Sequence, residues 1–327
     1  MTRTEFDAWV LRQREQVKQA LDSLLPDTGP ARLADAMRHS VFGSGDCPRA
    51  LLVMAARDAV AGSAAAALRA AVAVELVYAG ARSHQDLPCM DVGSVEIARP
   101  STCVRYGETL SLLAGNANMA LAFVLLTGDR AVPAVMQARL CALLADAAGH
   151  TGLTGGLAIE ATQSTALLSN AELRDLHTRK TGALLQASVL MGAACGDAPK
   201  GAVAALRDYA NAIGLARCVV NDVREASQIR EPLCPGINRS TVSDTPSFVT
   251  TLGEQAARTY AASLRDHARQ ALVRSGLPST ELLSRIADMV IDHETCATVS
   301  LRAASCPDWR QHGDNQVCRS TADESCA

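Results

Sequence analysis

Aromatic residues are scarce in this chain, at 3% of its 327 residues, although hydrophobic residues reach 48%. Alanine and leucine therefore supply most of the apolar surface, which favours close-packed helices over sheets. The alternation of polar and apolar residues that is typical of a half-buried strand does not occur. From these patterns we predict an all-α fold of about ten helices.

A surplus of basic residues is also missing, since the formal net charge is −3. This balance argues against nucleic acid as a partner. No run approaches the roughly 18 uncharged apolar residues that a transmembrane helix needs. The first segment, Met1–Asp7, is polar and lacks the apolar stretch of a signal peptide. We therefore expect a cytoplasmic protein with no membrane insertion.

Metal-binding cysteine pairs are absent as well. The chain has 11 cysteines, but none of them form a Cys-x-x-Cys pair and no cysteine–histidine spacing predicts a zinc site. We expect reduced, mostly buried thiols.

Helical periodicity runs through most of the chain without a fixed internal repeat, which predicts one domain over residues 1–295. The polar residues 296–327 are expected to form a loosely ordered tail.

Several helices can be placed from the apolar spacing. The segment 64–84 is long and mostly apolar, so it is expected to be central and buried. Further helices are predicted over 170–195, 202–223 and 246–275. The glycine-rich segment 151–156 is expected to interrupt the chain.

Two clusters of oxygen-bearing side chains follow two of these apolar helices. The first cluster contains Gln85, Asp86 and Asp91, and the second is Asn221-Asp222-Val223-Arg224-Glu225. Carboxylate and amide oxygens are suitable ligands for Mg²⁺. If the two helices face each other across a cavity, these clusters could hold magnesium between them.

A series of segments, in one order along the chain, resembles the trans-isoprenyl diphosphate synthases, the family of farnesyl and geranylgeranyl diphosphate synthases. The resemblance covers about residues 30–290 and is carried by 38–56, 73–91, 99–108, 113–123, 152–160, 177–188, 209–223 and 252–264. It implies an all-α, isoprenoid synthase-type helical bundle around a central cavity, usually a homodimer. It also implies joining of an allylic diphosphate to isopentenyl diphosphate, with magnesium ions held between two Asp-rich motifs.

The resemblance implies a set of site residues. Gln85 stands where the first Asp-rich motif begins with aspartate, and Asn221 where the second motif does. The implied metal ligands are Gln85, Asp86, Asp91, Asn221 and Glu225. Gln85 and Asn221 carry no charge, so the magnesium site is expected to be weakened. Lys180, in Lys180-Thr181-Gly182, matches a lysine of the family that contacts the allylic diphosphate. Lys180 and Asp86 are the expected catalytic residues.

The implied pocket for isopentenyl diphosphate has lost much of its charge. Its basic block corresponds to residues 44–49, where only Arg49 keeps a positive charge and Asp46 reverses one. An aspartate repels the diphosphate that a lysine attracts. The family's histidine in this pocket reads Tyr78, and Arg217 replaces an aromatic residue before the second motif. Normal condensation is therefore expected to be impaired, with Arg49 and Lys180 as the remaining diphosphate-binding residues.

Three hypotheses follow. The first, which we favour, is a diverged synthase that uses or binds an allylic prenyl diphosphate of C10–C20, as a homodimer or with an active synthase. The second is an enzyme like a class I terpene cyclase, which ionises the prenyl diphosphate without isopentenyl diphosphate. The third is a non-catalytic subunit that modifies an active prenyl diphosphate synthase.

Structural roles are alternatives for several of these residues. Arg49 could form a structural ion pair, Tyr78 could be packed in the core, and His84 could be a hydrogen-bonded histidine at a helix end. Lys180 could be a solvated helix lysine. Arg217 could pair with a neighbouring aspartate.

Overall fold

The structure is a computed structural model that describes residues 1–25, 29–43, 47–90, 100–162, 168–230 and 247–292. Within these ranges the regular elements are all helical, which confirms the predicted all-α class. The predicted tail, 296–327, lies outside the described residues. The described helices are α1 (Arg3–Leu24), α2 (Ala31–Phe42), α3 (Pro48–Ala59), α4 (Ala64–Gln85), α5 (Thr102–Tyr106), α6 (Glu108–Thr127), α7 (Ala134–Ala148), α8 (Leu153–Thr162), α9 (Asn170–His177), the π-helix η2 (Thr178–Gly182), α10 (Ala183–Ala194), α11 (Lys200–Arg230), α12 (Phe248–Leu252), α13 (Glu254–Arg274) and α14 (Glu281–Asp292).

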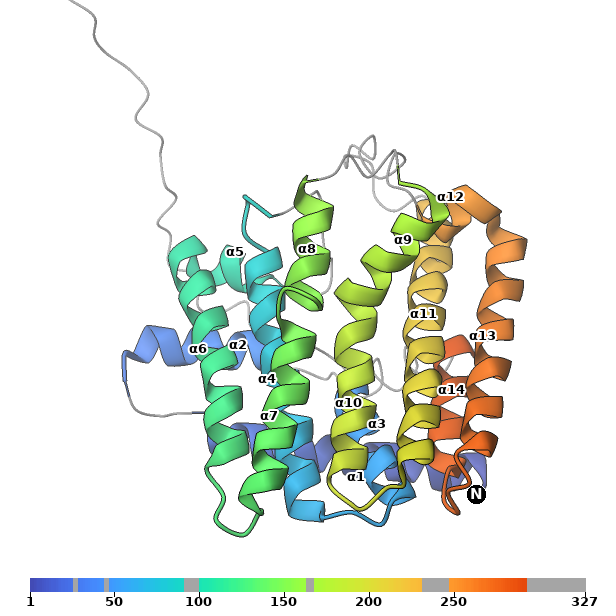
Figure 1. Cartoon of the computed structure of the whole chain (residues 1–327). Helices are drawn as coiled ribbons and strands as arrows, with labels where there is room; N and C mark the ends of the chain where they lie inside the picture. Colours follow the sequence, from blue (N-terminus) through green and yellow to red (C-terminus); the bar gives the residue numbers. More distant parts are fainter. Residues whose placement is uncertain (26–28, 44–46, 91–99, 163–167, 231–246, 293–327) are drawn as a thin grey trace, which may run out of the picture.

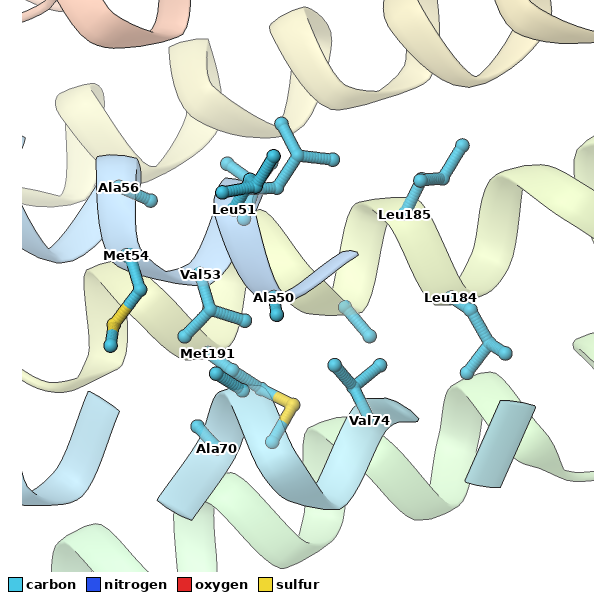
Figure 2. Packing of buried hydrophobic residues seen from close by; sticks show 14 of the residues in the cluster. Ala50, Leu51, Val53, Met54, Ala56, Ala70, Val74, Leu184, Leu185 and Met191 are labelled. Carbon is cyan, nitrogen blue, oxygen red and sulfur yellow. The ribbon is translucent and has the colours of Figure 1, made fainter. Parts of the chain in front are cut away.

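The core is organised around α4, as its apolar sequence predicts. Residues on all sides of this helix are buried, because α3, α6 and α10 pack against it. Figure 2 shows Val53 of α3, Val74 of α4 and Met191 of α10 meeting between these helices. With so few aromatic residues, the interior is filled by alanine and medium-sized aliphatic side chains, and the helices approach closely.

Two glycines make this close approach possible. A Cβ atom on Gly80 of α4 would lie 2.7 Å from the carbonyl oxygen of Gly115 of α6. On Gly192 of α10 it would lie 2.3 Å from the carbonyl oxygen of Val53 of α3. Both distances are shorter than a carbon–oxygen contact allows, so the backbones touch only because these side chains are absent.

Several predicted boundaries were wrong for local reasons. Residues 151–156 do not interrupt the chain entirely, since α8 begins at Leu153 and includes Gly156. The predicted helix 170–195 contains the π-helix η2, and the predicted helix 246–275 is divided at Gly253, whose φ of +82° suits glycine. The helix predicted over 64–84 extends one residue further, to Gln85, so the first polar cluster begins inside α4.

The free cysteines among the described residues are Cys47, Cys89, Cys103, Cys141, Cys195 and Cys218. Only Cys195 and Cys218 of this set are buried and Cys89 is exposed, so "mostly buried" was wrong for these thiols.

Figure 1 shows the arrangement that positions the candidate site. The C-terminal ends of α4 and α11 lie at the same end of the bundle, where α8, α9 and α12 also lie. The two polar clusters therefore end up at one end of the molecule, although more than a hundred residues separate them in sequence.

Candidate functional site

Lys180 is held inside the π-helix η2, between α9 and α10. Its Nζ atom donates to Glu160 of α8, at 2.8 Å from Oε1 and 2.7 Å from Oε2. Glycines bring the neighbouring helices close to η2: a Cβ on Gly156 would lie 2.6 Å from the Lys180 amide nitrogen, and one on Gly214 would lie 3.0 Å from the Gly182 Cα. Lys180 is thus a fixed, ion-paired lysine rather than a solvated one. π-Helical turns of this kind frequently occur at functional sites.

The second polar cluster lies on α11 and divides into different roles. Asp222 is buried, and its Oδ2 accepts a hydrogen bond from the Phe248 amide of α12 at 2.7 Å. Burial raises the pKa of Asp222 to about 6, although the Phe248 hydrogen bond opposes this change. Asn221 is half-buried and Glu225 is exposed. Although the residue is exposed as a whole, partial desolvation of its carboxyl group raises the pKa of Glu225, and the charges of Lys180 and Arg224 offset part of this effect.

Two neutral groups lie within the electrostatic influence of Lys180. The His177 ring stacks on Phe248, with 5.4 Å between ring centroids, and burial together with the Lys180 charge lowers the His177 pKa to about 4. Burial also raises the pKa of the Cys218 thiol to about 12. Both groups are therefore uncharged at neutral pH. Neither residue was predicted from the sequence, because a lone histidine or cysteine carries no spacing signal.

A second group of charged residues lies deeper in the bundle, where α3 meets α4. Arg49 and Glu75 are both buried, and Arg49 Nη1 lies 3.7 Å from Glu75 Oε2. Glu75 Oε1 accepts a hydrogen bond from the Ala50 amide at 3.0 Å. The Arg49 guanidinium carbon lies 3.2 Å from the centroid of the Tyr78 ring, a cation–π contact. Arg49 thus forms the structural ion pair that was one of its alternatives, and Tyr78 is packed against it.

This buried ion pair is incompletely satisfied. Among the described residues, neither Arg49 Nε nor Glu75 Oε2 has a hydrogen-bond partner. Buried charged donors and acceptors are normally fully paired, because leaving one unpaired is costly. The site therefore contains a buried guanidinium with hydrogen-bonding capacity to spare.

Two further arginines act on the same group. Burial raises the pKa of Glu75, while the charges of Arg49 and Arg217 lower it. Burial alone would raise the pKa of Tyr78, but Arg49 and Arg82 outweigh that effect and lower it. Arg82 of α4 and Arg217 of α11 are both half-buried. The charge of Arg217 thus acts on Glu75 and that of Arg82 on Tyr78, from the two helices that carry the polar clusters.

The first polar cluster is only partly described. Gln85 is the last residue of α4 and Asp86 is its C-cap, and both are half-buried. Asp91 lies outside the described residues, as does Asp46. His84 has its Nε2 atom 3.2 Å from the carbonyl oxygen of Leu112, which confirms the prediction of a hydrogen-bonded histidine at a helix end.

The described side chains are a poor donor set for magnesium. Within the described ranges, no three His, Cys, Asp or Glu side chains lie close enough together to hold a metal ion. Asp222 is bound to the start of α12, and Glu160 is paired with Lys180. Gln85 and Asn221 offer only neutral oxygens. Magnesium binding by Gln85, Asp86, Asp91, Asn221 and Glu225 stays a prediction.

Comparison with known proteins gives concordant results. The family model of the polyprenyl synthetases matches residues 30–238. The chain is 31% identical over 275 residues to the Arabidopsis thaliana protein "Heterodimeric geranylgeranyl pyrophosphate synthase large subunit 1, chloroplastic", covering 82% of this chain and 74% of that one. It is 32% identical over 274 residues to "Geranylgeranyl pyrophosphate synthase 9, chloroplastic" of the same plant, covering 82% and 76%.

Solved structures are similar over nearly the whole fold. A putative farnesyl-diphosphate synthase from Marinomonas sp. MED121 superposes with a TM-score of 0.76 at 29% identity, covering 89% of this chain and 100% of that one. An FPP/GFPP synthase from Zymomonas mobilis superposes with a TM-score of 0.78 at 27% identity, covering 88% and 99%.

Proposed function

This chain belongs to the polyprenyl synthetase family, the trans-isoprenyl diphosphate synthases, and we propose that it binds an allylic prenyl diphosphate of C10–C20 beside the polar clusters of α4 and α11. The observation that carries this proposal is the fixed position of Lys180. An ammonium group has three N–H donors, so Lys180 can donate to Glu160 and still reach a phosphate oxygen. Glu160 holds the side chain in place before the ligand arrives, which reduces the entropy lost on binding.

We further propose that condensation with isopentenyl diphosphate is impaired. Support comes from Arg49, whose charge is partly neutralised by Glu75 at 3.7 Å. Asp46 adds a negative charge within the same basic block of the sequence. Like charges repel each other more strongly the closer they lie. The carboxylate of Asp46 is therefore expected to weaken the binding of a second diphosphate there.

A second candidate function, a subunit of an assembly with an active synthase, is favoured by the exposed apolar surface of α6. Leu112, Leu113 and Val124 of this helix are exposed, and an apolar groove lies beside it, between α2 and α6. By length and composition, α4 and α6 could each cross a membrane, but the apolar window of α4 is 72% buried in the core, whereas that of α6 is 39% buried. We propose that a second subunit, either a copy of this chain or a related synthase, covers α6.

Product analysis tests these proposals. The purified protein is incubated with geranyl, farnesyl or geranylgeranyl diphosphate and Mg²⁺, with and without isopentenyl diphosphate. We expect binding of an allylic diphosphate and little chain elongation. Efficient elongation would contradict the impaired condensation, and a hydrocarbon or alcohol made without isopentenyl diphosphate would support the cyclase hypothesis instead.

Binding itself is tested by calorimetric titration with farnesyl diphosphate. Lys180→Ala is expected to lower the affinity by roughly ten- to hundred-fold, since it removes a charged hydrogen bond. Lys200→Ala is the matched control, because Lys200 is exposed at the other end of α11. Equal affinity of the two variants would contradict the role of Lys180.

A further inference from the structure

An open hollow of about 920 Å³ lies at the surface of the bundle, between α9 and the first three turns of α13. It is on the side of the bundle away from α6 (Figure 1). Its walls include Arg174 of α9, Leu252 of α12 and Tyr260 of α13. Among the described residues, no member of either polar cluster lines it. Ligand pockets typically occupy roughly 300–1,000 Å³, so the hollow is large enough for a small molecule.

The ring of Tyr260 is a fixed part of this wall. The Arg174 guanidinium carbon lies 5.0 Å from the centroid of the Tyr260 ring. Phe248 of α12 packs against the same ring, with 6.1 Å between the ring centroids, and Phe248 in turn stacks on His177. Because these neighbours hold Tyr260, the wall is in place before a ligand arrives, which reduces the entropy lost on binding.

Arg174 gives the hollow a positive charge that the protein does not neutralise. Arg174 makes no ion pair within the described part of the chain. Asp175, the next residue, is paired with Arg179 at 2.8 Å. Glu254, which also lines the hollow, is paired with Arg258 at 2.9 Å. A guanidinium group binds carboxylate or phosphate oxygens in two parallel hydrogen bonds, so this charge suits an anionic group.

Much of the remaining wall is apolar. Leu252 is exposed, and Ala256 and the Tyr260 ring extend the apolar surface. Thr259 and Ser263 also line the hollow, but their hydroxyl groups donate to carbonyl oxygens of α13 itself, at 3.0 and 2.8 Å. An apolar wall with one cation at its edge matches a ligand that has an apolar body and one anionic head group.

We propose that this hollow binds an anionic amphiphile, whose phosphate or carboxylate head group contacts Arg174 and whose apolar body covers Leu252, Ala256 and Tyr260. The hollow is a second ligand site, separate from the site proposed at Lys180, and its binding does not depend on Lys180.

The test is a calorimetric titration of the purified full chain carrying Lys180→Ala, which weakens the site proposed at Lys180. The probes are farnesyl monophosphate, myristate and farnesol, each below the concentration at which it forms micelles. At least one of the two anionic probes is expected to bind about ten-fold more tightly than farnesol, because farnesol has no charged head group for Arg174. The probe that binds more tightly identifies the head group, and either head group supports the inference.

Two substitutions in the same background change the hollow in different ways. Arg174→Leu removes its charge, and Ala256→Trp fills it without changing the charge. Each is expected to weaken binding of the anionic probe by about ten-fold or more. Arg139→Leu and Ala138→Trp make the same changes at exposed positions of α7 and are the matched controls, expected to leave binding unchanged.

Arg174→Lys keeps the charge without the planar guanidinium and is expected to bind with intermediate affinity. It also replaces Arg174→Leu if that variant fails to fold, as judged by circular dichroism. Equally tight binding of farnesol, no binding of either anionic probe, or binding that survives both Arg174→Leu and Ala256→Trp would overturn the inference. None of these results bears on the proposed function, which is tested with Lys180 intact.

Discussion

Asp222 of α11 accepts a hydrogen bond from the backbone amide of Phe248 at 2.7 Å, and this bond joins α11 to the start of α12. The same contact packs Phe248 against His177, directly before the π-helix that holds Lys180. An acidic residue in the second polar cluster is thus used to position the site rather than to face a ligand.

The first prediction concerns pH. The pKa of Asp222 is raised from its ordinary 3.8 to about 6, so ionisation of the buried carboxylate destabilises the folded state. The penalty is absent below about pH 4, grows between about 4 and 6, and is constant above. Asp222→Asn keeps an acceptor for Phe248 and removes the charge. Its Tm relative to wild type is expected to increase as pH rises from 4 to 7.

Asp222→Ala is the control for this series. It removes the acceptor as well as the charge, so it leaves the Phe248 amide without its partner and is expected to be less stable than Asp222→Asn at every pH. A Tm difference between Asp222→Asn and wild type that does not change with pH would contradict the assignment of the raised pKa.

The second prediction concerns the buried pair Arg49–Glu75. Arg49→Leu leaves the Glu75 carboxylate buried without its cation, which is expected to lower the free energy of unfolding by about 3–5 kcal/mol. The double variant Arg49→Leu/Glu75→Gln should recover much of this loss, because glutamine can still accept from the Ala50 amide. Urea denaturation measures the free energy of unfolding of both variants.

Arg258→Leu provides the comparison, since Arg258 and Glu254 form a surface pair one turn apart on α13. Arg258→Leu is expected to lower the free energy of unfolding by less than about 1 kcal/mol. Similar losses in the free energy of unfolding for Arg49→Leu and Arg258→Leu would contradict the larger penalty expected for breaking the buried pair.

The third prediction concerns the contact between α3 and α10. A Cβ on Gly192 would meet the Val53 carbonyl oxygen at 2.3 Å, and backbone atoms cannot move aside cheaply. Gly192→Ala is expected to destabilise the protein by about 1–3 kcal/mol. Gly201→Ala on α11 meets no atom within 4 Å and should be neutral or stabilising by up to about 1 kcal/mol. Thermal unfolding distinguishes them, and equal Tm values would refute the close contact.

The fourth prediction concerns the two neutral amides of the polar clusters. Gln85→Asp combined with Asn221→Asp adds one carboxylate to each cluster. We expect stronger Mg²⁺ binding by calorimetry than in the wild-type protein, because the new charges attract the cation. Unchanged Mg²⁺ binding would mean that the two clusters do not face a common site.

Much of the fold was predictable from the sequence, because apolar spacing and low aromatic content point to packed helices. The buried centre, α4, followed directly from its uninterrupted apolar residues. The start of α8 did not, since Gly156 looked like a break and is in fact a contact surface for the Lys180 backbone. Glycine is ambiguous in a sequence because the same missing side chain permits either a turn or a close contact.

The site was predicted in part. Lys180 and Arg49 were singled out from the sequence, and their contact with a diphosphate stays a prediction. Their ion-pair partners, Glu160 and Glu75, were not foreseen, because ion pairs between distant segments leave no spacing signal. Arg82 was missed altogether: a single arginine at the end of an apolar helix is usually a solvated residue. Arg82 lies one turn after Tyr78 on α4, and only the packing of α3 against α4 places Arg49 over the same ring.

The most direct measurement is a crystal structure of the protein with a non-reactive thio analogue of farnesyl diphosphate. The account predicts that a diphosphate oxygen of the analogue lies within hydrogen-bonding distance of Lys180 Nζ, while Lys180 keeps its ion pair with Glu160. An analogue whose diphosphate is bound elsewhere, away from Lys180, would contradict it.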